Sequence, residues 1–179
     1  DRLIVNDDAF VDTTAERDKL SGFEILRSTE AGSSTYDLAN FSTITTVEIG
    51  GTTDTTVNSL ATSDTITVFG DDVGDVTLGL SGAQAGGSDA LSVNFDNSIL
   101  KNADGVDISG AGLTAANVDT ITINSTGGNV NTGQANSVSS LGTGNGDLET
   151  VNITGDTAFS LTTGASSADT VNAASFTGV

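Results

Sequence analysis

One short phrase recurs along this chain and limits its fold more than any other feature. It consists of an acidic residue, usually a threonine, and then aliphatic residues at alternate positions. The full copies begin at Glu24, Asp64, Asp89, Asp119, Glu149 and Asp169, and a weaker copy begins at Thr45. A phrase that returns after roughly 20 to 30 residues indicates stacked repeating units, each too small to bury its own apolar side.

Each copy of the phrase has the character of a half-buried β-strand. Apolar and polar residues alternate within it, and the β-branched residues Thr, Val and Ile dominate. Clusters of Gly, Ser, Asn and Asp separate the copies, for example at residues 82–87 and 142–147. Because Gly and Asn reach positive φ easily, these clusters predict tight corners. A second short strand is expected between copies, at residues 76–80, 106–108 and 159–161.

The spacing predicts an all-β fold, a right-handed parallel β-helix or solenoid of irregular coils. Every coil would contribute one aliphatic residue to a shared inward stack. That stack is predicted to contain Ile66, Leu91, Ile121, Val151 and Val171. The alternative is an antiparallel β-sandwich, which also uses short alternating strands. The number of residues between successive copies of the phrase is irregular, and two-residue Asn-Gly hairpins are scarce. Both features favour the solenoid.

The domain organisation expected from this pattern is simple. Residues 1–19 lack the phrase and are predicted to be an irregular lead-in, whereas residues 20–179 are predicted to form one domain of solenoid coils. The pattern still runs at residue 179, so we expect a segment of a longer repeat region.

The composition excludes several kinds of partner, metal site and catalytic site for this chain. The chain has 24 acidic and 5 basic residues, a formal net charge of −19, and no cysteine or histidine. Nucleic acid and anionic membranes would be repelled by this charge. Disulfides, thiolate or imidazole metal ligands, and Cys or Ser–His nucleophiles are impossible within this chain. No apolar run approaches the ~18 residues of a transmembrane helix, so no membrane insertion is expected.

The acid at the head of each strand predicts a cation. Equivalent residues of stacked strands lie ~4.8 Å apart, so neighbouring carboxylates repel by ~1 kcal/mol in water and ~3 kcal/mol at an effective dielectric near 20. A cation that takes oxygen ligands would reverse this repulsion. Since sulfur and imidazole ligands are missing from the sequence, Ca²⁺ fits best.

Three local stretches suggest where calcium would bind. Residues 87–93 reproduce the G-x-D-x-L half of the calcium-binding nonapeptide repeat, residues 70–75 place three carboxylates around two glycines, and residues 144–147 form another glycine–acid turn. The candidate calcium ligands are Asp71, Asp72, Asp75, Asp89, Asp96 and Asp147. The alternative is that these acids cap turns in solvent.

Two other functions are disfavoured by the residues. The T-x-T elements at 65–67 and 120–122 could array hydroxyls against ice, but other copies of the phrase do not keep them, so ordinary outward-facing threonines are expected. For glycoside hydrolysis, no pair of acids stands out, and the chain has no tryptophan and one tyrosine. We therefore expect no enzyme.

Several stretches resemble one family of extracellular proteins. Residues 20–27 (LSGFEILR), with 36–38 and 44–47 after them, resemble the "GFETLRV … TTVNL" modules of bacterial surface-layer proteins. Residues 148–154 and 170–178 are similar to the "VETVNIT … TVNASAFTG" units of the same proteins. The resemblance is to the calcium-dependent crystalline surface layers of Gram-negative bacteria exported by type I secretion, and to related repeat-rich adhesins.

The resemblance covers most of residues 19–179 and implies a function. It implies an RTX-related, secreted structural protein whose copies bind one another in a calcium-dependent lattice at the cell surface. Calcium would lie at coil turns and between subunits. Any cell-surface polysaccharide would be bound through a region outside this chain. The alternative is a β-solenoid spacer of a secreted adhesin or biofilm matrix protein.

Overall fold

The computed structural model confirms the predicted parallel β-solenoid. It describes the chain apart from residues 7–19, 30–31, 84–86, 101–104, 109–111, 128–134, 143–147, 164–167 and 179. Every pairing between described strands is parallel, as a solenoid requires and an antiparallel sandwich does not allow. Helical structure in the described part is limited to the short 3-10 turns η2 (Leu38–Asn40) and η3 (Asn97–Leu100).

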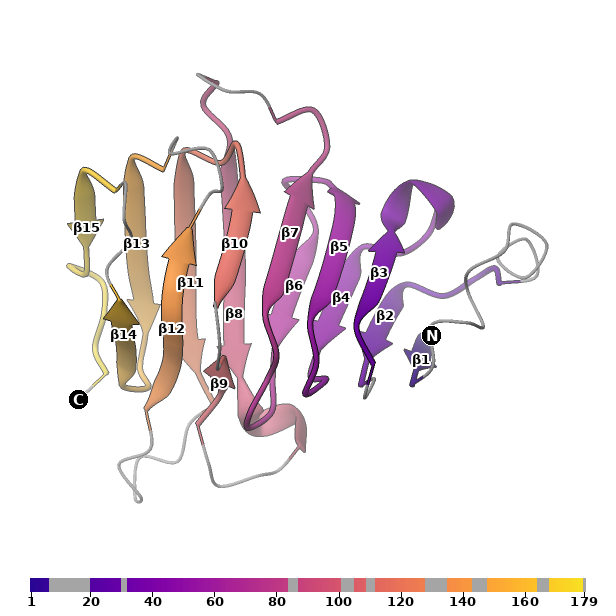
Figure 1. Ribbon diagram of the computed structural model, residues 1–179, viewed down its shortest axis with the longest axis horizontal. Coiled ribbons are helices and arrows are strands. Elements are labelled where there is room, and N and C mark those ends of the chain that lie inside the picture. Colours follow the sequence, from indigo (N-terminus) through magenta and orange to yellow (C-terminus); the bar gives the residue numbers. More distant parts are fainter. Residues whose placement is uncertain are drawn as a thin grey trace.

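The strands form two sheets that run along the molecule (Figure 1). The eight-stranded first sheet contains, in spatial order, β1 (Arg2–Val5), β2 (Ile25–Ser28), β4 (Thr46–Ile49), β6 (Thr65–Val68), β8 (Ala90–Asp96), β11 (Thr120–Thr126), β13 (Thr150–Gly155) and β15 (Thr170–Asn172). The seven-stranded second sheet contains β3 (Ser34–Asp37), β5 (Thr55–Leu60), β7 (Val76–Leu80), β10 (Leu113–Ala116), β12 (Asn136–Gly142) and β14 (Phe159–Thr163), with β9 (Asp107–Ile108) beside β12.

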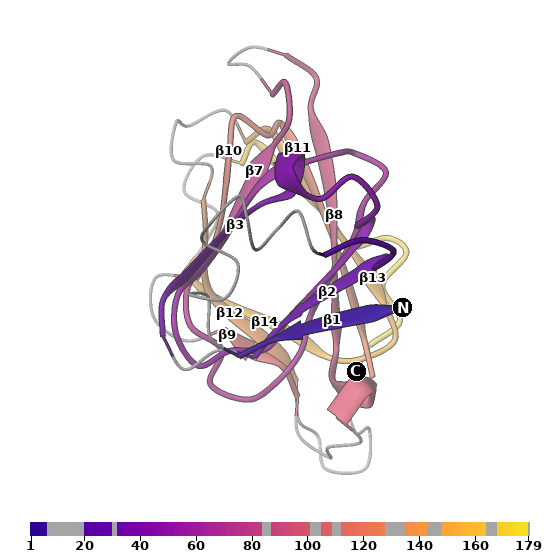
Figure 2. The ribbon, with the colours of Figure 1, turned by 90° about the vertical axis from the view of Figure 1, so that its right-hand side faces the viewer.

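The chain alternates between the two sheets, so each coil adds one strand to each of them. Seen along the stack of coils, the sheets lie on opposite sides of the interior (Figure 2). Residues Arg2–Val5, within the segment 1–19 that we expect to be an irregular lead-in, form β1 and pair with β2. No described helix is long and apolar enough to span a membrane.

The core consists of rows of aliphatic side chains, one from each coil. In the first sheet, one row is Leu26, Val47, Ile66, Val93 and Ile123, all with no exposed surface. In the second sheet, Tyr36, Val57, Leu78 and Ala115 form the facing row. Burying each large side chain stabilises the fold by about 1.5–3 kcal/mol. The rows belong to one continuous cluster of buried residues.

Three residues of the predicted inward stack are buried in one row, Val171 is in register with them but 59% exposed, and Ile66 lies in the neighbouring row. Leu91, Ile121, Val151 and Val171 are paired in one row, but Ile66 pairs with Val93 in the neighbouring row. The shift arises because β8 has seven residues and meets the four-residue β6 through its later part. A shift of two residues leaves every side chain on its original face, so it costs no burial.

Candidate functional site

Four of the head acids form a column at the start of the first sheet's later strands. The residues that follow them, Ala90, Thr120, Thr150 and Thr170, are paired in register. The backbone N–H of each later acid donates to the carbonyl of the acid before it, at 2.9, 2.8 and 3.0 Å. We call these residues the acid column: Asp89, Asp119, Glu149 and Asp169.

Within the acid column, Asp119 has a distinct structural role. Its side chain is 7% exposed, and its Oδ2 accepts the backbone N–H of Asp89 at 2.7 Å. A hydrogen bond to a charged acceptor contributes about 1.5–3 kcal/mol. The recurrence of the phrase identified Asp119 as a strand head, but Asp119 was not among the residues named as candidate calcium ligands.

A similar arrangement lies at the head of the second sheet. The Oδ1 of Asp75, a predicted calcium ligand, accepts the backbone N–H of Gly112 at 3.1 Å in the next coil. The N–H of Asp75 in turn donates to Oδ1 of Asp54 at 3.2 Å. These carboxylates therefore link successive coils through backbone amides. Sequence reasoning missed Asp54, whose only available signal was its 21-residue distance from Asp75.

The other predicted calcium ligands lie apart from one another. Asp71 and Asp72 are exposed in the bend before β7, and Asp72 is in the left-handed region with φ of 58°. Asp96 ends β8, the strand that Asp89 precedes, and its Oδ1 accepts the Ser98 N–H at 2.9 Å. At ~3.3 Å per residue, the length of β8 separates these two acids by about 20 Å.

No metal centre is assembled among the described residues. In that part of the chain, no group of three or more Asp, Glu, Cys or His residues could hold an ion. Asp147 lies outside the described residues. Calcium binding at any of these positions stays a prediction.

The outer side of the first sheet's later half carries no charged residue over three rows. We call it the neutral face: Ala90, Ser92, Asn94, Thr120, Thr122, Asn124, Thr150, Asn152, Thr154, Thr170 and Asn172. Side chains along it are joined from coil to coil. Asn124 Nδ2 donates to Asn94 Oδ1 at 3.1 Å, and Thr154 Oγ1 donates to Asn124 Oδ1 at 3.3 Å.

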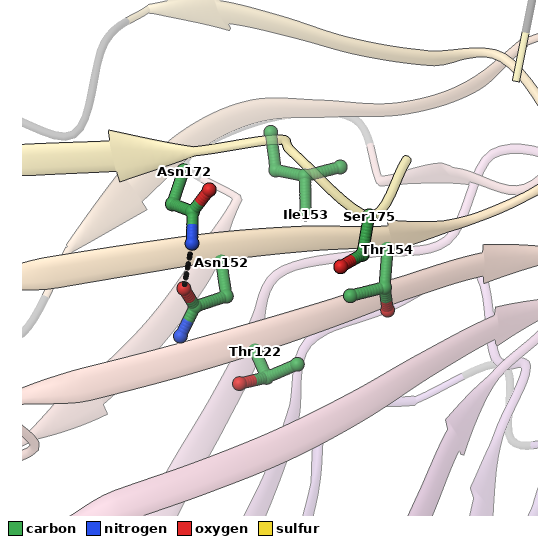
Figure 3. Close-up of a pocket in the computed structure, with 6 residues that line it drawn as sticks. All are labelled: Thr122, Asn152, Ile153, Thr154, Asn172 and Ser175. Carbon is green, nitrogen blue, oxygen red and sulfur yellow. Dashed lines mark hydrogen bonds between the residues drawn. The ribbon is translucent and has the colours of Figure 1, made fainter. Parts of the chain in front are cut away.

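A groove crosses the end of the neutral face (Figure 3). It lies where β15 stops at Asn172 and the chain turns, before Phe176 forms a bridge with Gly155. Its lining residues are Thr122, Asn152, Ile153, Thr154, Asn172 and Ser175, and Asn172 Nδ2 donates to Asn152 Oδ1 at 3.3 Å. Hydroxyl and amide groups of this kind bind neutral polar partners and provide no acid or base at neutral pH.

The earlier half of the same outer face is charged. Glu48, 6% exposed, accepts from Arg2 Nη2 at 3.1 Å and from Arg27 Nε at 2.5 Å. The Arg27 guanidinium also lies 4.8 Å from the centroid of the Phe69 ring. We call Arg2, Arg27, Glu48 and Phe69 the charged cluster.

Comparisons of this chain with protein-family models, curated proteins and solved structures found no match.

Proposed function

We propose that this chain is a structural segment of a calcium-dependent surface layer, secreted to the surface of a bacterial cell and assembled there from copies of itself. The observation that carries the proposal is the two-sheet parallel solenoid. Its stacking places equivalent residues of successive coils side by side on each outer face, and such repeated surfaces suit tiling against a neighbour. In this role the segment has no catalytic activity.

The acid column supports the dependence on calcium. Asp89, Asp119, Glu149 and Asp169 occupy successive coils of a chain with a net charge of −19. Carboxylate oxygens suit Ca²⁺, and sites in extracellular modules typically have dissociation constants of about 10⁻⁴–10⁻³ M. An ion present at about 100 times its dissociation constant would stabilise the fold by about 2.7 kcal/mol per site.

The test is a thermal melt followed by circular dichroism, with particle size followed by light scattering. The protein is compared in millimolar calcium, in magnesium and in chelator. We expect calcium alone to raise the melting temperature and to produce sheets. A monomer equally stable in all three solutions contradicts the calcium dependence.

Matched variants locate the effect. Replacing Asp89 and Glu149 by Asn and Gln removes two charges from the acid column and should remove most of the calcium response. Asp64→Asn is the control, because the Asp64 carboxylate accepts the Ala61 N–H at 2.8 Å within its own turn. Calcium-independent, monodisperse rods would instead favour the spacer of an adhesin or biofilm protein.

A further inference from the structure

The neutral face is the part of the first sheet where two copies of this chain can approach each other without opposing charges. The net charge of −19 makes copies repel wherever charged surfaces meet. We propose that a second copy of this chain packs against the neutral face. The inference rests on the proposed function, because it identifies the contact through which the layer would be assembled.

Charge is excluded from the face but present at both of its edges. The acid column runs along the strand heads, and Asp96 ends the outward positions of β8. A second copy whose contact is centred on Thr122 and Asn152 would meet hydroxyl and amide groups. The carboxylates of the acid column and of Asp96 would lie at the border of that contact. At physiological ionic strength, border charges more than about 8 Å from a partner's charges are largely screened.

The side chains of the face carry hydrogen-bonding groups that neighbouring coils hold in place. The bonds between Asn94 and Asn124 and between Asn152 and Asn172 hold these amides in ordered ladders. A side-chain amide can take part in about four hydrogen bonds, so the ladders leave capacity for bonds to a neighbouring copy. Amides already held by their neighbours lose less conformational entropy when a partner binds.

The outer side of the second sheet is a poorer contact. It presents a threonine row, Thr35, Thr56, Thr77 and Thr114. Its neighbouring row starts with Asp37 and ends with Gly79 and Ala116. Gly79 has no side chain, and the methyl group of Ala116 cannot form hydrogen bonds. This face therefore offers positions for matched control variants.

The size of the neutral face sets the strength of the contact. Four strands ~4.8 Å apart and five residues at ~3.3 Å each give about 300 Å² per copy, below the ~800 Å² per partner typical of stable pairs. A single contact is therefore weak, and assembly depends on each copy making several contacts at once. We expect a sharp critical concentration with no stable dimer below it.

The experiment compares isosteric substitutions on the two faces. Asn152→Asp introduces a charge at the centre of the neutral face, and Asn58→Asp introduces the same charge on the outer side of β5. In millimolar calcium, Asn152→Asp should raise the critical concentration for assembly about tenfold, the effect of about 1.4 kcal/mol. Asn58→Asp should leave it unchanged. Equal effects of the two variants, or none from Asn152→Asp, would overturn the proposal.

A second pair of variants removes charge from the test. Thr122→Tyr adds bulk to the neutral face, whereas Thr77→Tyr adds it to the second sheet, and tyrosine suits a strand at both positions. Only Thr122→Tyr should prevent assembly, while circular dichroism shows that both variants are folded. Assembly of Thr122→Tyr at the wild-type concentration contradicts the contact.

Two further outcomes separate this inference from the proposed function. If wild-type protein forms sheets that both neutral-face variants still form, the surface-layer role stands and this contact is wrong. If wild-type protein stays monomeric in calcium but binds a soluble neutral polysaccharide that Asn152→Asp does not bind, the partner is a glycan and the second copy is excluded.

Discussion

The two halves of the first sheet share one interior and have opposite exteriors. Inward rows such as Leu26, Val47, Ile66, Val93 and Ile123 continue through both halves without exposed surface. Outward positions change from the charged cluster in the earlier half to the neutral face in the later half. The comparison shows that the interior determines the fold, whereas the exterior can be specialised region by region without disturbing it.

Two coils of the later half, from Ala90 to Thr120 and from Thr120 to Thr150, are longer than the coils of the earlier half. Register-equivalent positions advance from Ile25 to Thr46 in the earlier half and from Ala90 to Thr120 in the later half. The longer coil accommodates β9, whose Ile108 pairs with Val138 and bridges to Val73. A longer coil thus adds a short strand and its own apolar row, while the spacing of the first sheet is unchanged.

The largest expected effects test whether the interior is equivalent in both halves. Leu26→Ala and Ile123→Ala each remove a side chain with no exposed surface, and each should lower the free energy of unfolding by about 2–5 kcal/mol in urea titrations. Val171→Ala is the control, because Val171 is 59% exposed and should cost well under ~1 kcal/mol. A small loss from only one of the buried variants would show that the two halves are not packed alike.

The charged cluster should be more sensitive than the neutral face. Glu48→Gln keeps the side-chain size but leaves Arg27, whose side chain is 13% exposed, without its carboxylate. We therefore expect the free energy of unfolding to fall by about 2 kcal/mol. Arg2→Gln should cost less, because the Arg2 side chain is 41% exposed. Chemical denaturation measures both losses, and an equal loss from the two variants would place the stabilisation outside the Arg27–Glu48 pair.

An intermediate effect is expected in the acid column. Asp119→Ala removes the acceptor of the Asp89 N–H and should lower the free energy of unfolding by about 1–3 kcal/mol in calcium-free buffer. Glu149→Ala, at an exposed position of the same column, should change it by less than about 0.5 kcal/mol. Similar losses from both variants would argue against a special role for the buried carboxylate.

The smallest effect is expected for the ladders of the neutral face. Asn124→Ala removes the bonds to Asn94 and Thr154 but leaves the core intact, so the free energy of unfolding should fall by only about 0.5–1 kcal/mol. Thr114→Ala, on the outer side of the second sheet, is the control. A loss as large as that of Ile123→Ala would mean that the ladders contribute to the fold as strongly as the core does.

The sequence predicted the strands and most of one core row because alternation is a local property. Leu91, Ile121, Val151 and Val171 could be aligned from their phrases alone. The row of Ile66 could not be predicted in this way. Alternation repeats every two residues, so a register shifted by two residues satisfies the alternating pattern equally well. β9 was expected as a second strand at residues 106–108, but the phrase did not predict its pairing with β12, which joins Ile108 to Val138.

For the candidate sites, too, some features could be predicted from the sequence and others depended on the tertiary structure. By itself, the sequence determined the chain's strong negative charge, its lack of sulfur and imidazole ligands, and the presence of acids at strand heads. Tertiary structure alone decided that Asp75 and Asp119 accept amides from other coils, and that Thr and Asn residues from four strands form one neutral face. The physical reason is register: contacts between coils depend on how the two sheets pack and how long each corner is, and neither is encoded within a single phrase.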